Sequence, residues 1–236
     1  MTMLPIAVLA GGLATRMGDL TRNTPKSLLL VAGEPFIAHQ LRLFRREGIE
    51  RVILCTGHFG EQIAEFVGDG SRFGLQVGYS SDGDKLRGTG GAIKKALPLL
   101  GKEFFVTYGD SYLDISYQPV ANAFRSAGMP GLMTILRNED KWDTSNVLFQ
   151  NGRIVRYSKV PAIGMKHIDF GLGVLSAQVF ESEPQVDPFD LSVTYANLVE
   201  IGQMAGFEVE QRFYEIGSPR GLSETSAHLL ETMAPE

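Results

Sequence analysis

Two adjacent glycines and two cations near the N-terminus form the stretch of this sequence that is best suited to bind phosphate. Gly11 and Gly12 follow the apolar segment 6–10, and they precede Arg16 and Lys26. The backbone of a glycine turn can approach a ligand closely because no Cβ lies in the way, and the N–H groups of such turns bind anions. Arg16 and Lys26 would neutralise the charge of a phosphate held there.

The spacing of these residues excludes two well-known phosphate motifs. A dinucleotide fingerprint requires Gly-x-Gly-x-x-Gly, but residues 11–16 read Gly-Gly-Leu-Ala-Thr-Arg. A P-loop requires Gly-Lys followed by Ser or Thr at a fixed distance, and that sequence does not follow here. An ordinary strand-to-helix turn with two solvated cations is the alternative interpretation.

Strand and helix patterns alternate along the first half of the chain. The expected strands cover residues 6–10, 51–56, 75–79 and 104–108, and the expected helices cover 35–47, 61–66 and 90–100. Such alternation is typical of right-handed βαβ units and a mostly parallel sheet, in which ligands bind beyond the carboxyl ends of the strands. Because Gly11, Gly12 and Asp110 each follow an expected strand, we expect them to share one site.

The second half of the chain has a different pattern. A hairpin is expected over 147–157, because Asn151-Gly152 suits a type I′ turn. Further strands are expected over 168–176 and 207–214, and helices over 191–203 and 219–233. Ser218 would cap the last helix, because a serine side chain can accept a hydrogen bond from a free N–H of the first turn.

Length and composition narrow the class of protein. The chain has 236 residues, 44% of them apolar, and a net charge of −5, so it has no basic footprint for nucleic acid. No apolar run approaches the ~20 residues that span a bilayer, and no signal-peptide pattern is present. The single cysteine, Cys55, allows no internal disulfide and suits a reducing compartment. We expect one cytoplasmic α/β domain over 1–236 with no membrane partner, and a substrate-side lobe at 137–176.

The order Gly-Gly-x-x-Thr-Arg, then Pro-Lys, resembles the signature of the sugar-1-phosphate nucleotidyltransferase family. The short chain is similar to a compact branch that includes N-acetylmuramate-1-phosphate uridylyltransferases and heptose-1-phosphate guanylyltransferases. The resemblance implies a Rossmann-like, three-layer αβα fold with a mostly parallel mixed sheet and a small β-hairpin lobe. It also implies the reaction: with Mg²⁺ bound, the phosphate of a sugar 1-phosphate attacks the α-phosphorus of a nucleoside triphosphate and releases pyrophosphate.

On the nucleotide side, the resemblance implies a role for two glycine-rich segments. Arg16 would hold the leaving pyrophosphate and Lys26 the reacting phosphates. The second segment, 88–92, reads Gly-Thr-Gly-Gly-Ala and opens a helix, so its N–H groups are expected to be free for a base or ribose. The expected nucleotide-binding residues are Leu9, Ala10, Gly11, Gly12, Thr15, Gly88, Thr89 and Gly90.

Two carboxylates are expected to hold the metal ion. Asp110 lies in a Gly-Asp pair that carries a metal ligand in the family. Glu215 lies in Phe-Tyr-Glu-Ile-Gly, where the family usually has Asp, and its longer side chain leaves a direct metal contact or a water-mediated one open.

On the sugar side, the resemblance is carried by single residues. Lys159 matches the lysine of a Glu-Lys-Pro segment that meets the sugar's phosphate, although Ser158 replaces the glutamate. Asp169 and Gly171 fall where the family often has Asn-x-Gly contacting sugar hydroxyls, and Asn146 is a further candidate.

Three other functions stay open at this point. A phosphocholine-type cytidylyltransferase would use a different acceptor at the same site. A glycosyltransferase of similar fold would use a nucleotide sugar and an Asp-x-Asp metal motif, for which Asp82-Gly83-Asp84 is the candidate, although this segment is better interpreted as a turn. A nucleotide-binding regulator without catalysis would explain the departures at Ser158 and Glu215. The oligomeric state and the identities of the base and the sugar are open.

Overall fold

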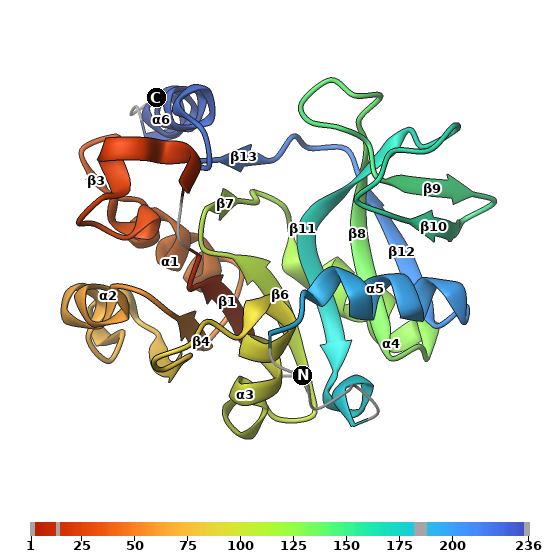
Figure 1. The fold of residues 1–236 in the computed structure, drawn as a ribbon, viewed down its shortest axis with the longest axis horizontal. Coiled ribbons are helices and arrows are strands. Elements are labelled where there is room, and N and C mark those ends of the chain that lie inside the picture. The colour runs from red at the N-terminus through yellow and green to blue at the C-terminus, as the bar shows by residue number, and fades with distance from the viewer. Residues whose placement is uncertain (1–2, 13–14, 182–187, 234–236) are drawn as a thin grey trace.

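The computed structural model describes residues 3–12, 15–181 and 188–233, without the side chains of Thr15, Arg16, Asp19 and Met233. Within these residues, nine strands form one mixed sheet in the order β10-β9-β11-β6-β1-β4-β5, with β8 paired to β11 and β12 (Figure 1). Strands β6, β1, β4 and β5 are parallel to one another, whereas β11 is antiparallel to β6. The parallel part is the half predicted from the alternating pattern.

The elements of this fold have the following bounds. The strands of the sheet are β1 (Ile6–Ala10), β4 (Arg51–Thr56), β5 (Gln76–Ser81), β6 (Glu103–Tyr108), β8 (Gly131–Arg137), β9 (Val147–Gln150), β10 (Arg153–Tyr157), β11 (His167–Ser176) and β12 (Met204–Val209). Short pairs are formed by β2 (Leu30–Val31) with β3 (Glu34–Pro35) and by β7 (Ser111–Tyr112) with β13 (Tyr214–Glu215). The helices are α1 (Phe36–Arg46), α2 (Gly60–Val67), α3 (Gly88–Leu100), α4 (Tyr117–Ala127), α5 (Leu191–Glu200) and α6 (Pro219–Met233).

Alternate residues of β1 serve two hydrophobic cores on opposite faces of the sheet. Ile6 and Val8 pack into a core with residues of α1, α2 and α4, whereas Ala7 packs into a core with residues of α3 and α5. Because both faces of the sheet are covered by helices, its central strands β1, β4 and β6 are largely buried and apolar. This arrangement confirms the predicted three-layer α/β fold.

The predicted hairpin is also present. Asn151 and Gly152 both have positive φ, 51° and 75°, as a type I′ turn requires. The strand predicted over 207–214 is wrong in its bounds: β12 runs from Met204 to Val209 because it pairs in parallel with β8, and residues 210–213 leave the sheet toward β13. The helix predicted over 191–203 ends at Glu200.

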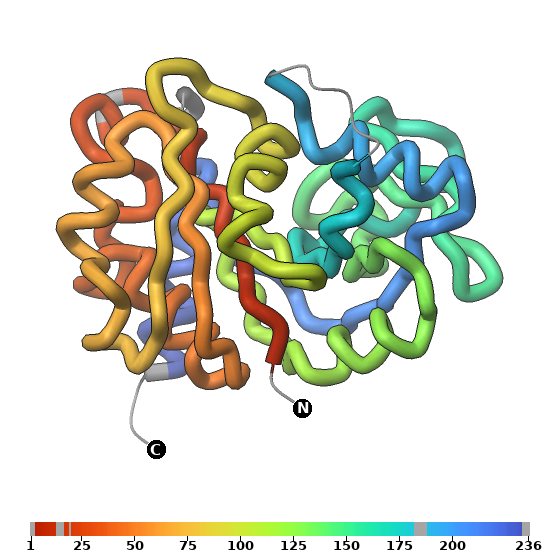
Figure 2. Tube along the Cα trace, turned by 90° about the horizontal axis from the view of Figure 1, so that it is seen from below, coloured from red at the N-terminus to blue at the C-terminus, as the bar shows by residue number. Residues whose placement is uncertain are grey.

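The last helix returns to the N-terminal side of the molecule. Figures 1 and 2 place the first half of the chain on one side of the molecule and most of the second half on the other, while α6 crosses back to lie near β3 and α1. A third core holds this contact through Val31, Phe36, Ile216 and Leu229, among others. Within the described residues, no helix is long and apolar enough to cross a membrane.

Candidate functional site

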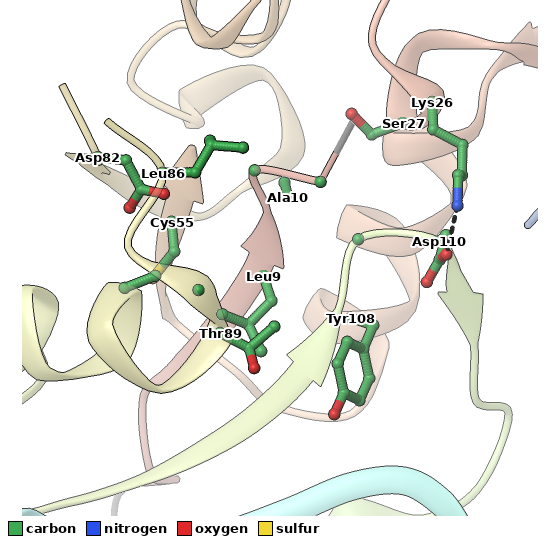
Figure 3. A pocket seen from close by; sticks show the side chains of 15 residues that line it. Leu9, Ala10, Lys26, Ser27, Cys55, Asp82, Leu86, Thr89, Tyr108 and Asp110 are labelled. Carbon is green, nitrogen blue, oxygen red and sulfur yellow. Dashed lines mark hydrogen bonds and ion pairs between the residues drawn. The ribbon is translucent and has the colours of Figure 1, made fainter. Parts of the chain in front are cut away.

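A cavity of about 230 Å³ opens at the carboxyl ends of β1 and β6. Eight of the expected site residues line it: Leu9, Ala10, Gly11, Gly12, Lys26, Gly88, Thr89 and Asp110. Figure 3 shows Lys26 and Asp110 at one end of the cavity and Asp82 at the other, with the residues of the β1 end between them. Because β6, β1, β4 and β5 are neighbours in this order, the cavity runs across the carboxyl edge of the parallel sheet.

The two glycines at the end of β1 are needed for different reasons. A Cβ at Gly11 would lie 3.0 Å from the backbone nitrogen of Gly57, which follows β4. The two backbone segments therefore touch at Gly11. A Cβ at Gly12 would meet no atom of the described residues within 4 Å. The space over Gly12 therefore lies open beside the cavity, where a bare backbone can approach a ligand.

The cation expected to meet the reacting phosphates lies against the expected metal ligand. Lys26 Nζ donates to Asp110 Oδ2 over 2.8 Å, although the residues are 84 positions apart, and the side chains are 17% and 29% exposed. Lys26 begins a short 3₁₀ helix, Lys26–Leu28, and Asp110 follows β6 directly. Lys26 and Asp110, which the sequence analysis expected in one site, therefore lie in direct contact at one end of the cavity.

Glu215 lies next to this pair through the contact between β13 and β7, in which Glu215 is the partner of Ser111. A methyl group added at Gly217 would lie 2.5 Å from Glu215 Oε2 and 3.5 Å from both Asp110 Oδ2 and Lys26 Nζ. Gly217 is therefore the point around which the two carboxylates and the ammonium gather, and any side chain there would fill the space between them.

The carboxylate of Glu215 also stabilises the beginning of α6. Its Oε2 accepts a hydrogen bond from the Gly217 N–H, and its Oε1 accepts one from the Ser218 hydroxyl over 2.7 Å. Ser218 Oγ in turn accepts from the Gly221 N–H over 2.9 Å, which confirms Ser218 as the cap of α6. Glu215 thus has a structural role that the sequence comparison did not indicate.

The donor set at this end of the cavity suits a hard cation. Asp110 and Glu215 offer carboxylate oxygens, the ligands that Mg²⁺ prefers, and Mg²⁺ ordinarily completes its shell with water and substrate phosphates. The described residues contain no cluster of three or more His, Cys, Asp or Glu side chains that would hold a metal without such help. Among the described residues, Asp110 Oδ1 has only a 3.4 Å contact from the Ser111 hydroxyl, whereas both oxygens of Glu215 already accept hydrogen bonds.

The expectation of free N–H groups at the start of α3 is wrong for Gly90. Its N–H donates to the Phe189 carbonyl over 3.0 Å, and Gly90 does not line the cavity. A Cβ at Gly90 would lie 2.2 Å from the Phe189 ring. The absence of a side chain at Gly90 therefore allows the Phe189 ring, just before α5, to pack against α3. Gly88 and Thr89 are the residues at the start of α3 that line the cavity.

Two of the expected sugar-side residues hold each other in place. Asn146 Oδ1 accepts from the Asp169 N–H over 2.8 Å, and Asp169 Oδ1 accepts from the Gly171 N–H over 3.0 Å. Gly171 has a φ of 97°, and a Cβ there would lie 3.9 Å from the ring of Tyr108, which lines the cavity. Asn146, Asp169 and Gly171 therefore form a group beside the cavity, next to Tyr108.

Burial raises the pKa of the Asp169 carboxyl to about 6, although hydrogen bonds from the Gly171 N–H and the Tyr157 hydroxyl act in the opposite direction. Burial also raises the pKa of Tyr157, and the neighbouring charge of Asp169 adds to that increase. A carboxyl with a pKa near 6 changes its charge close to neutral pH, so the acceptor capacity of this group depends on pH.

Lys159 does not line the cavity. Its ammonium donates to Asp190 Oδ2 over 2.6 Å, in an ion pair whose side chains are 62% and 48% exposed. Asp190 also accepts from the hydroxyl of Thr89, a residue of the cavity wall, over 3.3 Å. The expected sugar-side lysine is thus connected to the nucleotide side through a residue that the sequence analysis missed.

Asp82, considered in the sequence only as part of a possible Asp-x-Asp motif, is a second residue of the cavity that the expected site did not include. It is buried and lines the cavity, and its Oδ2 accepts from the Arg87 N–H over 3.1 Å. Asp84 is exposed and lines a different hollow beside α2. The two aspartates of Asp82-Gly83-Asp84 therefore do not converge as a metal pair. The usable signal for Asp82 was its place directly after β5.

The side chains of Thr15 and Arg16 lie outside the described residues, so their expected roles stay predictions. Cys55 is buried at the end of β4 in the cavity wall, and burial raises the pKa of its thiol to about 12. This confirms the expectation of a small core residue rather than a reactive thiol.

Known proteins resemble this chain in sequence. The family model described as Nucleotidyl transferase matches residues 6–146. N-acetylmuramate alpha-1-phosphate uridylyltransferase of Neisseria meningitidis serogroup B is 40% identical over 111 residues, which are 47% of this chain and 48% of that protein. UTP–glucose-1-phosphate uridylyltransferase of a Synechocystis species is 26% identical over 203 residues, which are 78% of this chain and 52% of that protein. The chain spans about half the length of these curated relatives.

A solved structure shares the fold over nearly the whole chain. The structure of a putative glucose-1-phosphate thymidylyltransferase from Bacillus anthracis, in complex with a sucrose, aligns with a TM-score of 0.87 at 20% identity and covers 99% of this chain and 98% of its own. At this identity the likeness shows the fold alone. The family model, in contrast, covers more than half of the sequence and includes both Lys26 and Asp110, so the chain belongs to the nucleotidyl transferase family.

Proposed function

We propose that this protein transfers a nucleotidyl group from a nucleoside triphosphate to a sugar 1-phosphate and releases pyrophosphate. The observation that carries the proposal is the meeting of Lys26 with Asp110 at the end of a cavity whose other walls include the bare backbone of Gly11 and Gly12. A cation, a carboxylate that can hold a metal ion and a glycine backbone with open space beside Gly12 lie at one edge of a parallel sheet, which is what a bound triphosphate needs. The curated relatives are named for this reaction.

In this proposal the phosphates lie at the Lys26 end of the cavity and the base lies toward Asp82. The wall between these ends is largely apolar, with Leu9, Ala10 and Leu86 among its residues, and it suits a base and ribose. Gly12 leaves space for a phosphate to approach the backbone. Arg16 is proposed to hold the leaving pyrophosphate.

Asp110 and Glu215 would hold Mg²⁺. When bound, this ion would offset the negative charge of the phosphate oxygens and fix their orientation. Lys26 adds a fixed positive charge at the same place, and it can do so without leaving Asp110 because an ammonium has three donors. Removal of repulsion between the two anionic substrates is the main requirement of this reaction, since the acceptor's own phosphate oxygen is the nucleophile.

The acceptor is proposed to lie beside Tyr108, between the cavity and the group of Asn146, Asp169 and Gly171. An ionised Asp169 would accept hydrogen bonds from sugar hydroxyls, and Lys159 would meet the sugar's phosphate. In-line transfer would require the attacking oxygen of an acceptor placed here to lie on the side of the α-phosphorus opposite the leaving pyrophosphate.

The test is pyrophosphate release with Mg²⁺ over a grid of substrates. ATP, GTP, CTP, UTP and dTTP are each combined with glucose 1-phosphate, mannose 1-phosphate, N-acetylglucosamine 1-phosphate, N-acetylmuramate 1-phosphate and phosphocholine. At least one triphosphate and sugar 1-phosphate pair should give turnover, and Lys26→Ala should lower kcat/KM about 100- to 1,000-fold, as removal of a preorganised charge does.

Lys102→Ala is the matched control, because Lys102 is exposed and precedes β6 at the end of the strand opposite to Asp110. It should leave turnover unchanged. Absence of pyrophosphate in every combination would contradict the proposed function, and turnover with phosphocholine alone would assign the acceptor to another class. Release of a nucleoside diphosphate from nucleotide sugars, with no release of pyrophosphate from triphosphates, would indicate a glycosyltransferase.

A further inference from the structure

The carboxylate of Asp190 lies between the nucleotide cavity and the lobe that carries Lys159. Its Oδ1 accepts from the Ser192 N–H over 2.9 Å and from the Thr89 hydroxyl over 3.3 Å, and its Oδ2 accepts from Lys159 Nζ over 2.6 Å. Thr89 is in the cavity wall, and Lys159 follows β10. One side chain thus connects a residue expected to meet the nucleotide with a residue expected to meet the sugar's phosphate.

The backbone fixes the place of this carboxylate. The Phe189 N–H donates to the Arg87 carbonyl over 3.0 Å, and the Gly90 N–H donates back to the Phe189 carbonyl over 3.0 Å. Gly90 packs so closely against the Phe189 ring that a Cβ would overlap with it. Asp190 is also the cap of α5. The segment before α5 is therefore held against the start of α3, and the Asp190 carboxylate is held with it.

This arrangement fixes the direction of the Thr89 hydroxyl. Its proton goes to Asp190 Oδ1, and its oxygen accepts from the Leu191 N–H over 2.8 Å. A hydroxyl has one donor and two acceptor positions, so the position that remains on Thr89 is an acceptor. The Thr89 hydroxyl oxygen can therefore accept a hydrogen bond from an N–H or O–H group of a nucleotide. It cannot donate one to a phosphate oxygen, because its proton is already donated to Asp190.

The same carboxylate restrains the flexible side chain of Lys159. The segment that carries this lysine is exposed, with Val160 at 71%. Partial burial raises the pKa of Asp190, but hydrogen bonds from Lys159 and Ser192 outweigh that effect and keep its pKa below the ordinary value, so Asp190 is ionised. Within the described residues the ammonium donates to Asp190, and its other two donors can meet an anion.

We propose that Asp190 is a positioning residue that places the ammonium of Lys159 for the acceptor's phosphate and at the same time sets the Thr89 hydroxyl in the nucleotide cavity. The proposal rests on the proposed function. Its consequence is that loss of the Asp190 charge weakens binding of the sugar phosphate through Lys159, while the capped helix and the fold persist.

The test compares Asp190→Asn, Lys159→Ala and the double variant by steady-state kinetics, with the substrate pair that is most active in the grid. Asparagine caps a helix as well as aspartate does, so the melting temperature of Asp190→Asn should match the wild type. Its KM for the sugar phosphate should rise about tenfold, with a much smaller change in kcat, because uniform binding is lost. The KM of the double variant for the sugar phosphate should be no higher than that of Lys159→Ala alone, because the two residues act as one unit.

Glu139→Gln is the matched control, because Glu139 is an exposed carboxylate of the same lobe that pairs with Arg137. It should leave both KM values unchanged. An unchanged or lower KM in Asp190→Asn, or effects that multiply in the double variant, would overturn the role of Asp190 while the proposed function stands. Absence of turnover by the wild type in the whole grid would overturn both.

Discussion

Asp110 Oδ2 accepts a hydrogen bond from Lys26 Nζ over 2.8 Å, so the carboxylate expected to hold a metal ion and the cation expected to hold phosphate form one pair. The pair joins the start of a 3₁₀ helix to the end of β6 across 84 residues. Its two charges act oppositely on a triphosphate, so we expect the contribution of Asp110 to depend on whether Mg²⁺ is bound.

The first prediction is therefore a reversal of sign in Asp110→Asn. Without Mg²⁺, loss of the carboxylate should tighten nucleotide binding about threefold to tenfold, because a charge that repels phosphate has been removed. With Mg²⁺ present, the same variant should bind the nucleotide more weakly by a similar factor, because a metal ligand is missing. Isothermal titration of the most active triphosphate with and without EDTA measures both. Weaker binding under both conditions would show that Asp110 acts only by shaping the site.

The second prediction separates the two carboxylates by stability. Glu215→Ala removes the acceptor for the Gly217 N–H and the partner of the capping Ser218, so it should cost about 1–2 kcal/mol. The thermal midpoint should fall by roughly 2–8 °C for a chain of this size. Asp110 caps no helix, although Asp110→Ala removes its ion pair with Lys26, so this variant should have a thermal midpoint between those of Glu215→Ala and the wild type. Equal melting of the two variants would contradict the structural role of Glu215.

The third prediction concerns the pH dependence of stability. The pKa of Asp169 is raised to about 6 in the folded protein and is about 4 in the unfolded chain. Between about pH 4 and 6 the folded state therefore binds more protons than the unfolded state. The contribution of Asp169 is therefore fully present below pH 4 and is lost as pH rises to about 6, by at most about 3 kcal/mol. Urea unfolding between pH 4 and 7 should show wild type losing stability relative to Asp169→Asn across this window. Parallel pH profiles would contradict the raised pKa.

The same titration should appear in activity, in the fourth prediction. Only the ionised form of Asp169 can accept hydrogen bonds at both oxygens, so the KM for the sugar phosphate should rise as pH falls through 6. The phosphate of the substrate titrates near the same pH. Asp169→Asn is the control, because the substrate's own titration remains in that variant. A wild-type profile that coincides with the variant's profile would remove Asp169 from the acceptor site.

The fifth prediction distinguishes the adjacent glycines. Gly11→Ala should destabilise the protein by about 1–3 kcal/mol, because its Cβ would press against the backbone of Gly57. Gly12→Ala should leave the thermal midpoint unchanged, because a Cβ there meets no described atom within 4 Å. It should nevertheless weaken nucleotide binding about tenfold or more, because the methyl group occupies the path of the phosphate. If Gly12→Ala bound the nucleotide as tightly as the wild type, the phosphates would not lie against Gly12, and the prediction would be wrong.

Much of the local structure of this protein could be predicted from the sequence. The alternating apolar pattern located β1, β4 and β6, and Asn151-Gly152 located the hairpin, because turn chemistry and side-chain period are local properties. The same pattern placed Gly11, Gly12 and Asp110 at the carboxyl edge. The bounds of β12 were not predictable in this way, because its pairing with β8 decided which residues are extended.

The sequence by itself indicated the types of group at the site, namely the glycine turn, the cation Lys26 and the carboxylates Asp110 and Glu215, and it predicts Arg16 as a further cation. Only the tertiary structure decided what each group contacts. It pairs Lys26 with Asp110, and it hydrogen-bonds Glu215 to the residues at the start of α6. The Gly90 N–H donates to the Phe189 carbonyl, Asp82 lines the cavity, and Asp190 contacts the cavity residue Thr89. The physical reason is that hydrogen bonds and ion pairs depend on positions within a few ångströms, and residues far apart in the chain reach such positions only after the sheet and its helices have packed.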